Sequence, residues 1–224
     1  MNKVEWYRNE VWDENTEKHF NDHLERVRLK QDYLRIQASY LTDNAPDAAL
    51  ALLDRYFEHG MHFDMAHAWY DRAVAFSAVG ETVRALEAFR TALQEEEVNP
   101  ARLTQAYLEL PMLVADAEVE VWYPIALDVL RAHAQRLVSH RDFFKWNAAN
   151  SLIMSARGFD EEAVKYALEA IQAKEDHAYG RKHYVNVGSM RNDDRHNSMY
   201  NKITVIAAYN KPSLKKRFGR MFSN

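Results

Sequence analysis

Apolar and small residues recur at helical spacing along most of the chain, and the stretch from Ala66 to Asn99 shows this pattern most completely. Two faces with a period of three to four residues are separated by a single glycine, Gly80. Small and aromatic side chains alternate on these faces at Trp69, Ala73, Phe76, Ala85, Phe89 and Ala92. Because a 3.6-residue period places such positions on one side of a helix, the stretch predicts two helices joined by a turn at Gly80.

A looser version of the same pattern precedes this stretch, over residues 30–60. Setting Ala49 against Ala85 aligns the two segments and places Asn44 at the turn position. Asn often replaces Gly where the backbone needs positive φ, so Asn44 is predicted to adopt that conformation. Pro46 is predicted to open the second helix, where its missing N–H costs no hydrogen bond.

The pattern also follows this stretch, clearly over residues 142–173, where Gly158 marks the turn. The intervening region is degenerate. Asn99-Pro100 is a helix break, and Pro111 falls within the next apolar period, where it predicts a kink. The apolar positions indicate one helix through Leu103, Tyr107, Leu110 and Val114, and another through Trp122, Ile125, Ala126, Val129, Leu130 and Leu137.

The N-terminal segment is charged but holds three large rings, Trp6, Tyr7 and Trp12. Such rings are seldom left exposed together, so they are predicted to cover the first helical pair. A helix capped by Asp13 or Asn15 follows, and we expect it to run to about Arg28.

The C-terminal part changes character after Lys174. No helical period is visible over residues 175–190, and a helix is predicted from near Asn192 to Lys211-Pro212. Its apolar face carries Met199, Ile203, Ile206 and Ala207. The remaining residues can form a short basic amphipathic helix. The expected organisation is an N-terminal segment (1–29), helical pairs (30–173) and a C-terminal part (174–224), all in one continuous domain.

Composition supports an all-α fold. The 224 residues are 47% apolar and include only 6 Gly and 5 Pro, so good helix formers dominate. The absence of cysteine excludes disulfides and thiolate chemistry. The N-terminus has no apolar stretch of signal length, and no run approaches about 18 apolar residues, so a cytoplasmic location is expected.

Charge is unevenly distributed, although the net value is only −4. From Arg181 onward, ten Lys and Arg face two Asp, which leaves residues 1–180 with a net charge of −12. Two explanations remain open. The basic end can attract an anionic partner, or it can fold back on the acidic body.

Residues 66–99 and 142–173 resemble the tetratricopeptide repeat in length, turn glycine and alternation of small and large positions. The Trp6-Tyr7-Arg8 opening together with the repeats also resembles stand-alone bacterial proteins of unknown function. The resemblance implies a right-handed α-solenoid whose first helices line a concave groove that binds a protein or peptide, without catalytic activity.

The resemblance also implies which residues line the groove: Gln31, Leu34, Arg35, Ala38, His67, Tyr70, Val74, Ser77, Lys145, Ala148, Leu152 and Ser155. Arg35 and Lys145 are the cations among them and lie far apart in the array, so a clamp for a peptide carboxylate is not predicted. Tyr70 with Arg35 is the best local anchoring pair, since Tyr and Arg dominate binding hot spots. The alternative is that Tyr70 packs between repeats.

Other chemistry is weakly indicated. His19 and His23 share a helix face, as metal ligands can, and a second group comprises His59, His62, Asp64 and His67. There is no HExxH motif, phosphate-binding glycine loop or nucleophile elbow, so no enzyme and no cofactor is predicted.

Arg181, Lys182 and His183 lie between two tyrosines, a mixture that suits phosphate contact. A nucleic-acid partner for the basic C-terminal region is therefore the alternative to a protein-binding scaffold. The acidic body argues against it.

Overall fold

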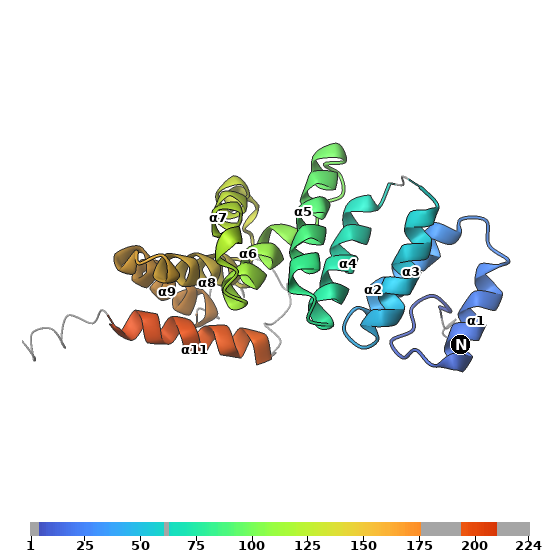
Figure 1. Cartoon of the computed structure of the whole chain (residues 1–224), viewed down its shortest axis with the longest axis horizontal. Helices are drawn as coiled ribbons and strands as arrows, with labels where there is room; N and C mark the ends of the chain where they lie inside the picture. Colours follow the sequence, from blue (N-terminus) through green and yellow to red (C-terminus); the bar gives the residue numbers. More distant parts are fainter. Residues whose placement is uncertain (1–4, 61–62, 176–193, 210–224) are drawn as a thin grey trace, which may run out of the picture. The chain divides into compact units, whose positions relative to one another are not determined.

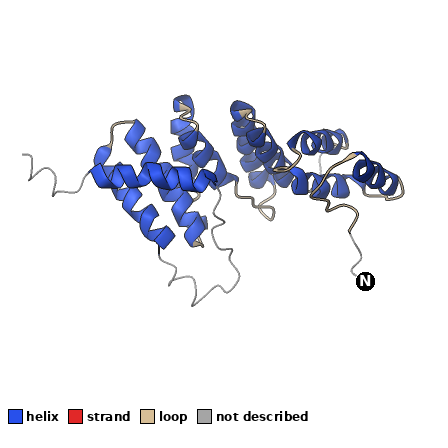
Figure 2. Cartoon of the chain, turned by 90° about the horizontal axis from the view of Figure 1, so that it is seen from below, coloured by secondary structure: helices blue, strands red, loops and turns tan. Residues whose placement is uncertain are grey.

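A computed structural model describes residues 5–60, 63–175 and 194–209. The described residues form helices joined by loops and no strand, which confirms the all-α prediction (Figure 2). They divide into two compact units, Met1–Tyr107 and Leu108–Asn224, a division that the sequence pattern did not indicate. No helix of the described residues combines the length and apolar character that crossing a bilayer requires.

The first unit contains α1 (Glu14–Leu24), α2 (Lys30–Leu41), α3 (Pro46–Glu58), α4 (Met65–Ala78) and α5 (Thr82–Val98) (Figure 1). Within it α2 packs against α3 and α4 against α5, and the two pairs meet where α4 contacts both α2 and α3. The alanines at the predicted small positions, among them Ala73, Ala85 and Ala92, are fully buried and allow close helix approach. Both helical pairs therefore form at the predicted residues.

Gly80 ends α4 in the geometry that the sequence predicts. Its φ is +79°, and the N–H of Glu81 donates to the carbonyl of Phe76 at 2.9 Å. Gly158 has the same φ, with a matching bond from the N–H of Phe159 to the carbonyl of Met154 at 2.9 Å. Both are Schellman turns, in which a residue of positive φ lets the chain satisfy the last carbonyls of a helix.

The prediction for Asn44 is wrong. Among the described non-glycine residues, Glu118 has a positive φ, at +54°, and Asn44 does not. The α2–α3 turn closes instead through the N–H of Ala45, which donates to the carbonyl of Leu41 at 2.9 Å. The Asn44 side chain is exposed, and its amide donates to the carbonyl of Glu10 at 3.4 Å. Pro46 opens α3, as predicted.

The N-terminal rings cover the first helices, as predicted. The ring centroids of Trp6 lie 5.4 Å from Phe20 and 4.8 Å from Tyr33, and Trp12 lies 5.5 Å from Phe20. Asp13 caps α1 by accepting from the N–H of Thr16 at 2.8 Å. The helix ends at Leu24, one turn earlier than expected.

A buried glutamine fastens this N-terminal segment to α2. The Gln37 side chain accepts from the backbone N–H of Asn9 at 3.0 Å and donates to its carbonyl at 2.8 Å. The Asn9 amide also donates to Gln37 Oε1 at 2.8 Å and to the carbonyl of Trp6 at 2.8 Å. Because the amide of Gln37 is fully buried, these bonds satisfy groups that would otherwise be costly to bury.

The second unit contains most of α6 (Ala106–Asp116), η1 (Glu120–Trp122), α7 (Tyr123–Ala132), η2 (Ala134–Arg136), α8 (His140–Ala156), α9 (Asp160–Glu175) and α11 (Asp194–Tyr209) (Figure 1). The α8–α9 pair forms at the predicted residues, and α11 packs on both of its helices through Met199 and Ile203, which are fully buried. The predicted amphipathic tail helix lies outside the described residues.

The region between the two clear repeats, where the apolar pattern is irregular, differs in detail from its prediction. Leu103 precedes α6 rather than lying on it and is 53% exposed. The helix runs through Pro111 to Asp116 and ends in a turn where the N–H of Val119 donates to the carbonyl of Val114 at 3.1 Å. Glu118 has the positive φ in this turn, a position that usually takes glycine.

Candidate functional site

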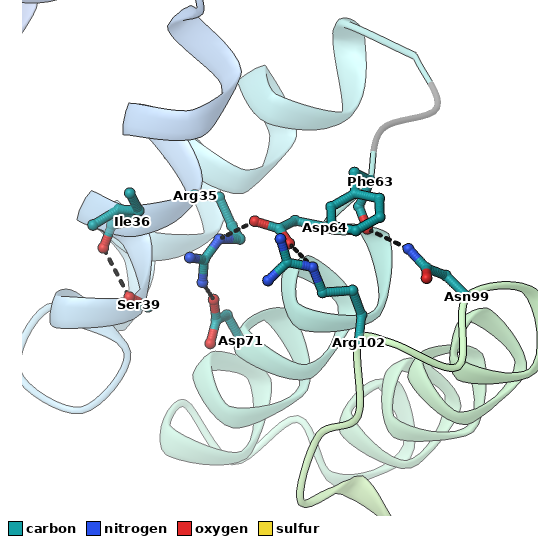
Figure 3. Close-up of polar contacts among 8 residues, drawn as sticks. All are labelled: Arg35, Ile36, Ser39, Phe63, Asp64, Asp71, Asn99 and Arg102. Atoms are coloured by element: carbon teal, nitrogen blue, oxygen red, sulfur yellow. Dashed lines mark hydrogen bonds and ion pairs between the residues drawn. The ribbon is translucent and has the colours of Figure 1, made fainter.

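Four charged side chains of alternating sign meet in the first unit, on α2, at and beyond the start of α4 and after α5, and we name them the Arg–Asp cluster: Arg35, Asp64, Asp71 and Arg102 (Figure 3). Arg35 lies on α2, and its Nη1 donates to Asp71 Oδ2 on α4 at 3.3 Å. Asp64, just before α4, lies between the two arginines. Its Oδ2 is 3.6 Å from Arg35 Nε, and its Oδ1 is 3.1 Å from Arg102 Nε.

Arg102 is held in position by the segment that follows α5. The buried carboxylate of Glu96 accepts from the N–H of Thr104 at 2.7 Å and from its hydroxyl at 2.6 Å. The Asn99 amide donates to the carbonyl of Phe63 at 3.2 Å, and the Arg102 guanidinium lies 4.2 Å from the centroid of the Phe63 ring. These contacts fix the loop after α5 against the residues that open α4, so that Arg102 reaches Asp64.

Burial increases through the cluster from Arg102 to Asp71. The exposed fraction of the side chain is 38% for Arg102, 27% for Asp64, 19% for Arg35 and 11% for Asp71. Burial raises the pKa of Asp71 to about 7, and the nearby Arg35 guanidinium opposes this rise. The cluster therefore runs from Arg102 and Asp64 near the surface to the pair of Arg35 and Asp71, in which Asp71 is the least exposed.

Two further titratable groups border the cluster. Burial lowers the pKa of His67, the positive charge of Arg35 lowers it further, and the Nδ1 of this ring has no hydrogen-bond partner among the described residues. Burial also raises the pKa of Tyr56, on α3, to about 12, and the carboxylate of Asp64 adds to this rise. Both groups are therefore neutral at neutral pH.

The structure separates the predicted groove residues of the first unit into exposed and buried positions. Gln31, Arg35, His67, Val74 and Ser77 are partly exposed. Leu34 and Ala38 are buried in the core of the unit, so their assignment to a groove surface is wrong.

Tyr70 lies against α5, with its ring centroid 5.7 Å from that of Phe89. Arg35 instead contacts Asp64 and Asp71. The Tyr70–Phe89 contact lies within one helical pair rather than between repeats, so the role of Tyr70 as an anchor stays a prediction.

The second unit does not present Lys145 as a groove cation. The Lys145 side chain is 6% exposed, and its ammonium group is paired with Glu109 of α6. Ala148 is fully buried, whereas Leu152 and Ser155 are partly exposed. Lys145 therefore joins α6 to α8 inside the unit, because an ammonium group at this depth needs a carboxylate partner.

Sequence reasoning missed Asp71 and Arg102 and placed Asp64 in a histidine cluster. One signal was available for Asp71. The alignment of Ala49 with Ala85 has an offset of 36 residues, and the same offset relates Arg35 to Asp71. Opposite charges at equivalent positions of neighbouring first helices predict an ion pair wherever those helices pack together. Arg102 gave no such signal, since it lies in a loop.

The described histidines of the two groups do not form an assembled metal site. His19 and His23 have ring centroids 4.3 Å apart, but the Nδ1 of His23 is 2.9 Å from the carbonyl of His19, and Trp6 stacks on the His23 ring. In the part of the chain that the structure describes, no group of three or more His, Asp or Glu side chains is arranged to hold a metal ion. His62 lies outside that part.

The predicted anion-binding residues Arg181, Lys182 and His183 also lie outside the described residues. Comparison with protein-family models, with curated proteins and with solved structures found no match. The site is therefore characterised by its own geometry: a partly exposed cluster whose formal charges cancel when all four groups are ionised.

Proposed function

We propose that this protein is a non-catalytic scaffold of tetratricopeptide-like pairs in an α-solenoid, which binds a protein or peptide partner on the face carrying the Arg–Asp cluster. The observation that supports this most is the position of the cluster. It joins the first helices of two successive pairs, α2 and α4, and its arginines remain partly exposed. A repeat scaffold of this kind binds through the surface that its first helices share.

The chemistry of this face suits a protein partner. Arg35 and Arg102 offer bidentate donors, and the exposed Phe63 ring beside Arg102 offers an apolar contact. Arginine and aromatic side chains are enriched among residues that dominate binding energy. Gln31 and Val74 extend the same face along α2 and α4 with partly exposed side chains.

The proposal can be tested by site-specific photocrosslinking in native cells. A photoreactive residue at Gln31 or Val74 is expected to capture one common protein, whereas one at Glu87, exposed on α5, is expected not to. Arg102→Ala should abolish capture. Arg84→Ala is the matched control, because Arg84 is an exposed arginine on α5 that pairs with Glu81.

Capture of the same protein from Glu87, or capture unchanged by Arg102→Ala, would contradict the proposal. Loss of capture after nuclease treatment would favour the nucleic-acid alternative instead. Since that alternative depends on the basic C-terminal region, substitution of Arg181 and Lys182 by Ala would then remove the captured complex. The affinity of the wild-type complex would also fall steeply with salt concentration.

A further inference from the structure

Asp71 is buried, as Glu96 is, but these two carboxylates of the first unit differ in how they are paired. The residue exposure of Asp71 is 8%, and Arg35 is the cation within ion-pair distance in the described structure. That contact, at 3.3 Å, is long for a charge-assisted hydrogen bond. A buried carboxylate with one long contact recovers only part of the solvation it loses.

The geometry of the cluster makes Arg35 depend on Asp71. Arg35 Nε faces Asp64 at 3.6 Å but makes no hydrogen bond there, and neither does Arg102 Nε with the other oxygen of Asp64. The bond from Arg35 Nη1 to Asp71 is thus the hydrogen bond that orients the guanidinium among the described residues. Loss of the charge on Asp71 would weaken this bond, because the guanidinium would then face a neutral acceptor.

We propose that Asp71 is a proton switch, which sets the charge of the Arg–Asp cluster and the position of Arg35. With Asp71 ionised, the cluster is neutral, and Arg35 ties α2 to α4. With Asp71 protonated, the cluster has a net charge of +1, and Asp64 is the one carboxylate left to attract the Arg35 guanidinium within the cluster. The switch is a property of the free protein; only its effect on partner binding rests on the proposed function.

The charges that act on Asp71 itself are those of Arg35 on α2 and Asp64 just before α4. Two titratable groups border the cluster: Tyr56 on α3, on which Asp32 of α2 and Glu95 of α5 also act, and His67 on α4, on which Glu96 of α5 and Arg102 also act. Arg35 favours the ionised form of Asp71, whereas Asp64 opposes it. Burial is the largest influence and raises the pKa of Asp71 to about 7. The pKa of His67 is lowered from 6.5, so its titration is separated from that of Asp71.

Carboxyl-detected NMR of the full-length protein between about pH 5 and 9 tests the switch without any partner. The side-chain carboxyl carbon of Asp71 is expected to shift with a midpoint near pH 7. The Nε–Hε signal of Arg35 should move with the same midpoint. This transition should disappear in Asp71→Asn and persist in Asp54→Asn, which removes the exposed carboxylate that pairs with Arg72 at 2.6 Å.

A midpoint for Asp71 below about pH 5, within the usual range of aspartates, would overturn the proposal. So would an Arg35 signal that does not follow Asp71 in the wild-type protein. Since these two readings need no variant, they decide the question even if Asp71→Asn fails to fold. Failure of the switch would leave the proposed scaffold function untouched, because the crosslinking experiment does not depend on protonation.

Discussion

Replacement of Asp71 by Asn should make the protein more stable at alkaline pH, by an amount that grows as the pH rises. The folded protein raises the pKa of this carboxyl from 3.8 to about 7, mainly through burial. The folded state thus holds the proton more tightly than the unfolded chain. The contribution of the carboxyl to stability is then complete below about pH 4 and is lost as the pH rises through about 7.

The size of the effect follows from the shift. At about 1.4 kcal/mol for each pKa unit, a rise from 3.8 to about 7 corresponds to roughly 4 kcal/mol. Relaxation and water entry around a partly exposed cluster reduce this value, so we expect about 1 to 4 kcal/mol. The asparagine in Asp71→Asn keeps the shape of the side chain and can accept from Arg35, but it does not titrate. The difference in unfolding free energy between the variant and the wild type should therefore increase between about pH 4 and pH 8.

Equilibrium urea unfolding at several pH values measures this difference. Pulsed hydrogen exchange of α4 peptides reads the first unit separately, since the chain contains two compact units. Asp54→Asn is the control, because Asp54 is 61% exposed and its pair with Arg72 should contribute under about 1 kcal/mol. The reasoning would be refuted if Asp71→Asn were less stable than the wild type at about pH 8 and if the difference in unfolding free energy stayed constant down to acid pH. This result would show that the ionised pair of Arg35 and Asp71 is well solvated.

Three other substitutions test particular features of the fold. Gly80→Ala should lower stability by about 1–2 kcal/mol from the positive φ alone, since an added Cβ meets nothing within 4 Å; an unchanged melting temperature would contradict the Schellman turn. Glu118→Gly should raise stability by about 0.5–1 kcal/mol, because glycine adopts the positive φ of +54° without a steric penalty. Thermal unfolding measures this gain, and Glu118→Ala is the control, because it removes the same side chain but keeps the Cβ. Lys145→Met should lower the free energy of unfolding by about 2–4 kcal/mol, because it leaves the carboxylate of Glu109 without its cation. Adding Glu109→Gln should restore at least half of this loss. Equal stability of the single and double variants in urea would mean that the two residues are not energetically coupled.

Much of the local structure could be predicted from the sequence because its causes lie within a few residues. The period of apolar positions places Ala73 and Phe89 inward on α4 and α5, and both are buried. Gly80 and Gly158 end their helices because glycine tolerates positive φ without a steric penalty. Pro46 begins α3, where its missing N–H has no partner to lose.

The same local reasoning fails where a distant contact competes. The repeat spacing predicts positive φ for Asn44, but its amide instead contacts the carbonyl of Glu10, 34 residues earlier. The apolar period places Leu103 on a helix, but Leu103 lies in the loop before α6, which the buried Glu96 carboxylate holds by binding Thr104. Neither contact could be inferred from spacing, since each depends on which surfaces the helices bring together.

In the candidate site, too, some features follow from the sequence and others from contacts between distant residues. The resemblance assigned Arg35 and His67 to groove positions of the first helices, and both are partly exposed. The 36-residue offset indicates Asp71 as a partner of Arg35, whereas the pairing of Asp64 with Arg102 has no signal in the sequence. Lys145 has the register of a groove cation and is nevertheless buried against Glu109, because α6 and α8 approach each other there.

The sequence by itself determined the helical class, most helix positions and the turn glycines, because periodicity and backbone preference are short-range properties. Apart from the offset that relates Arg35 to Asp71, the tertiary structure decided which charges pair, and it alone decided how deeply they are buried. Burial and proximity across helices control both the pKa of Asp71 and the orientation of Arg35, and neither is written in the spacing of residues along the chain.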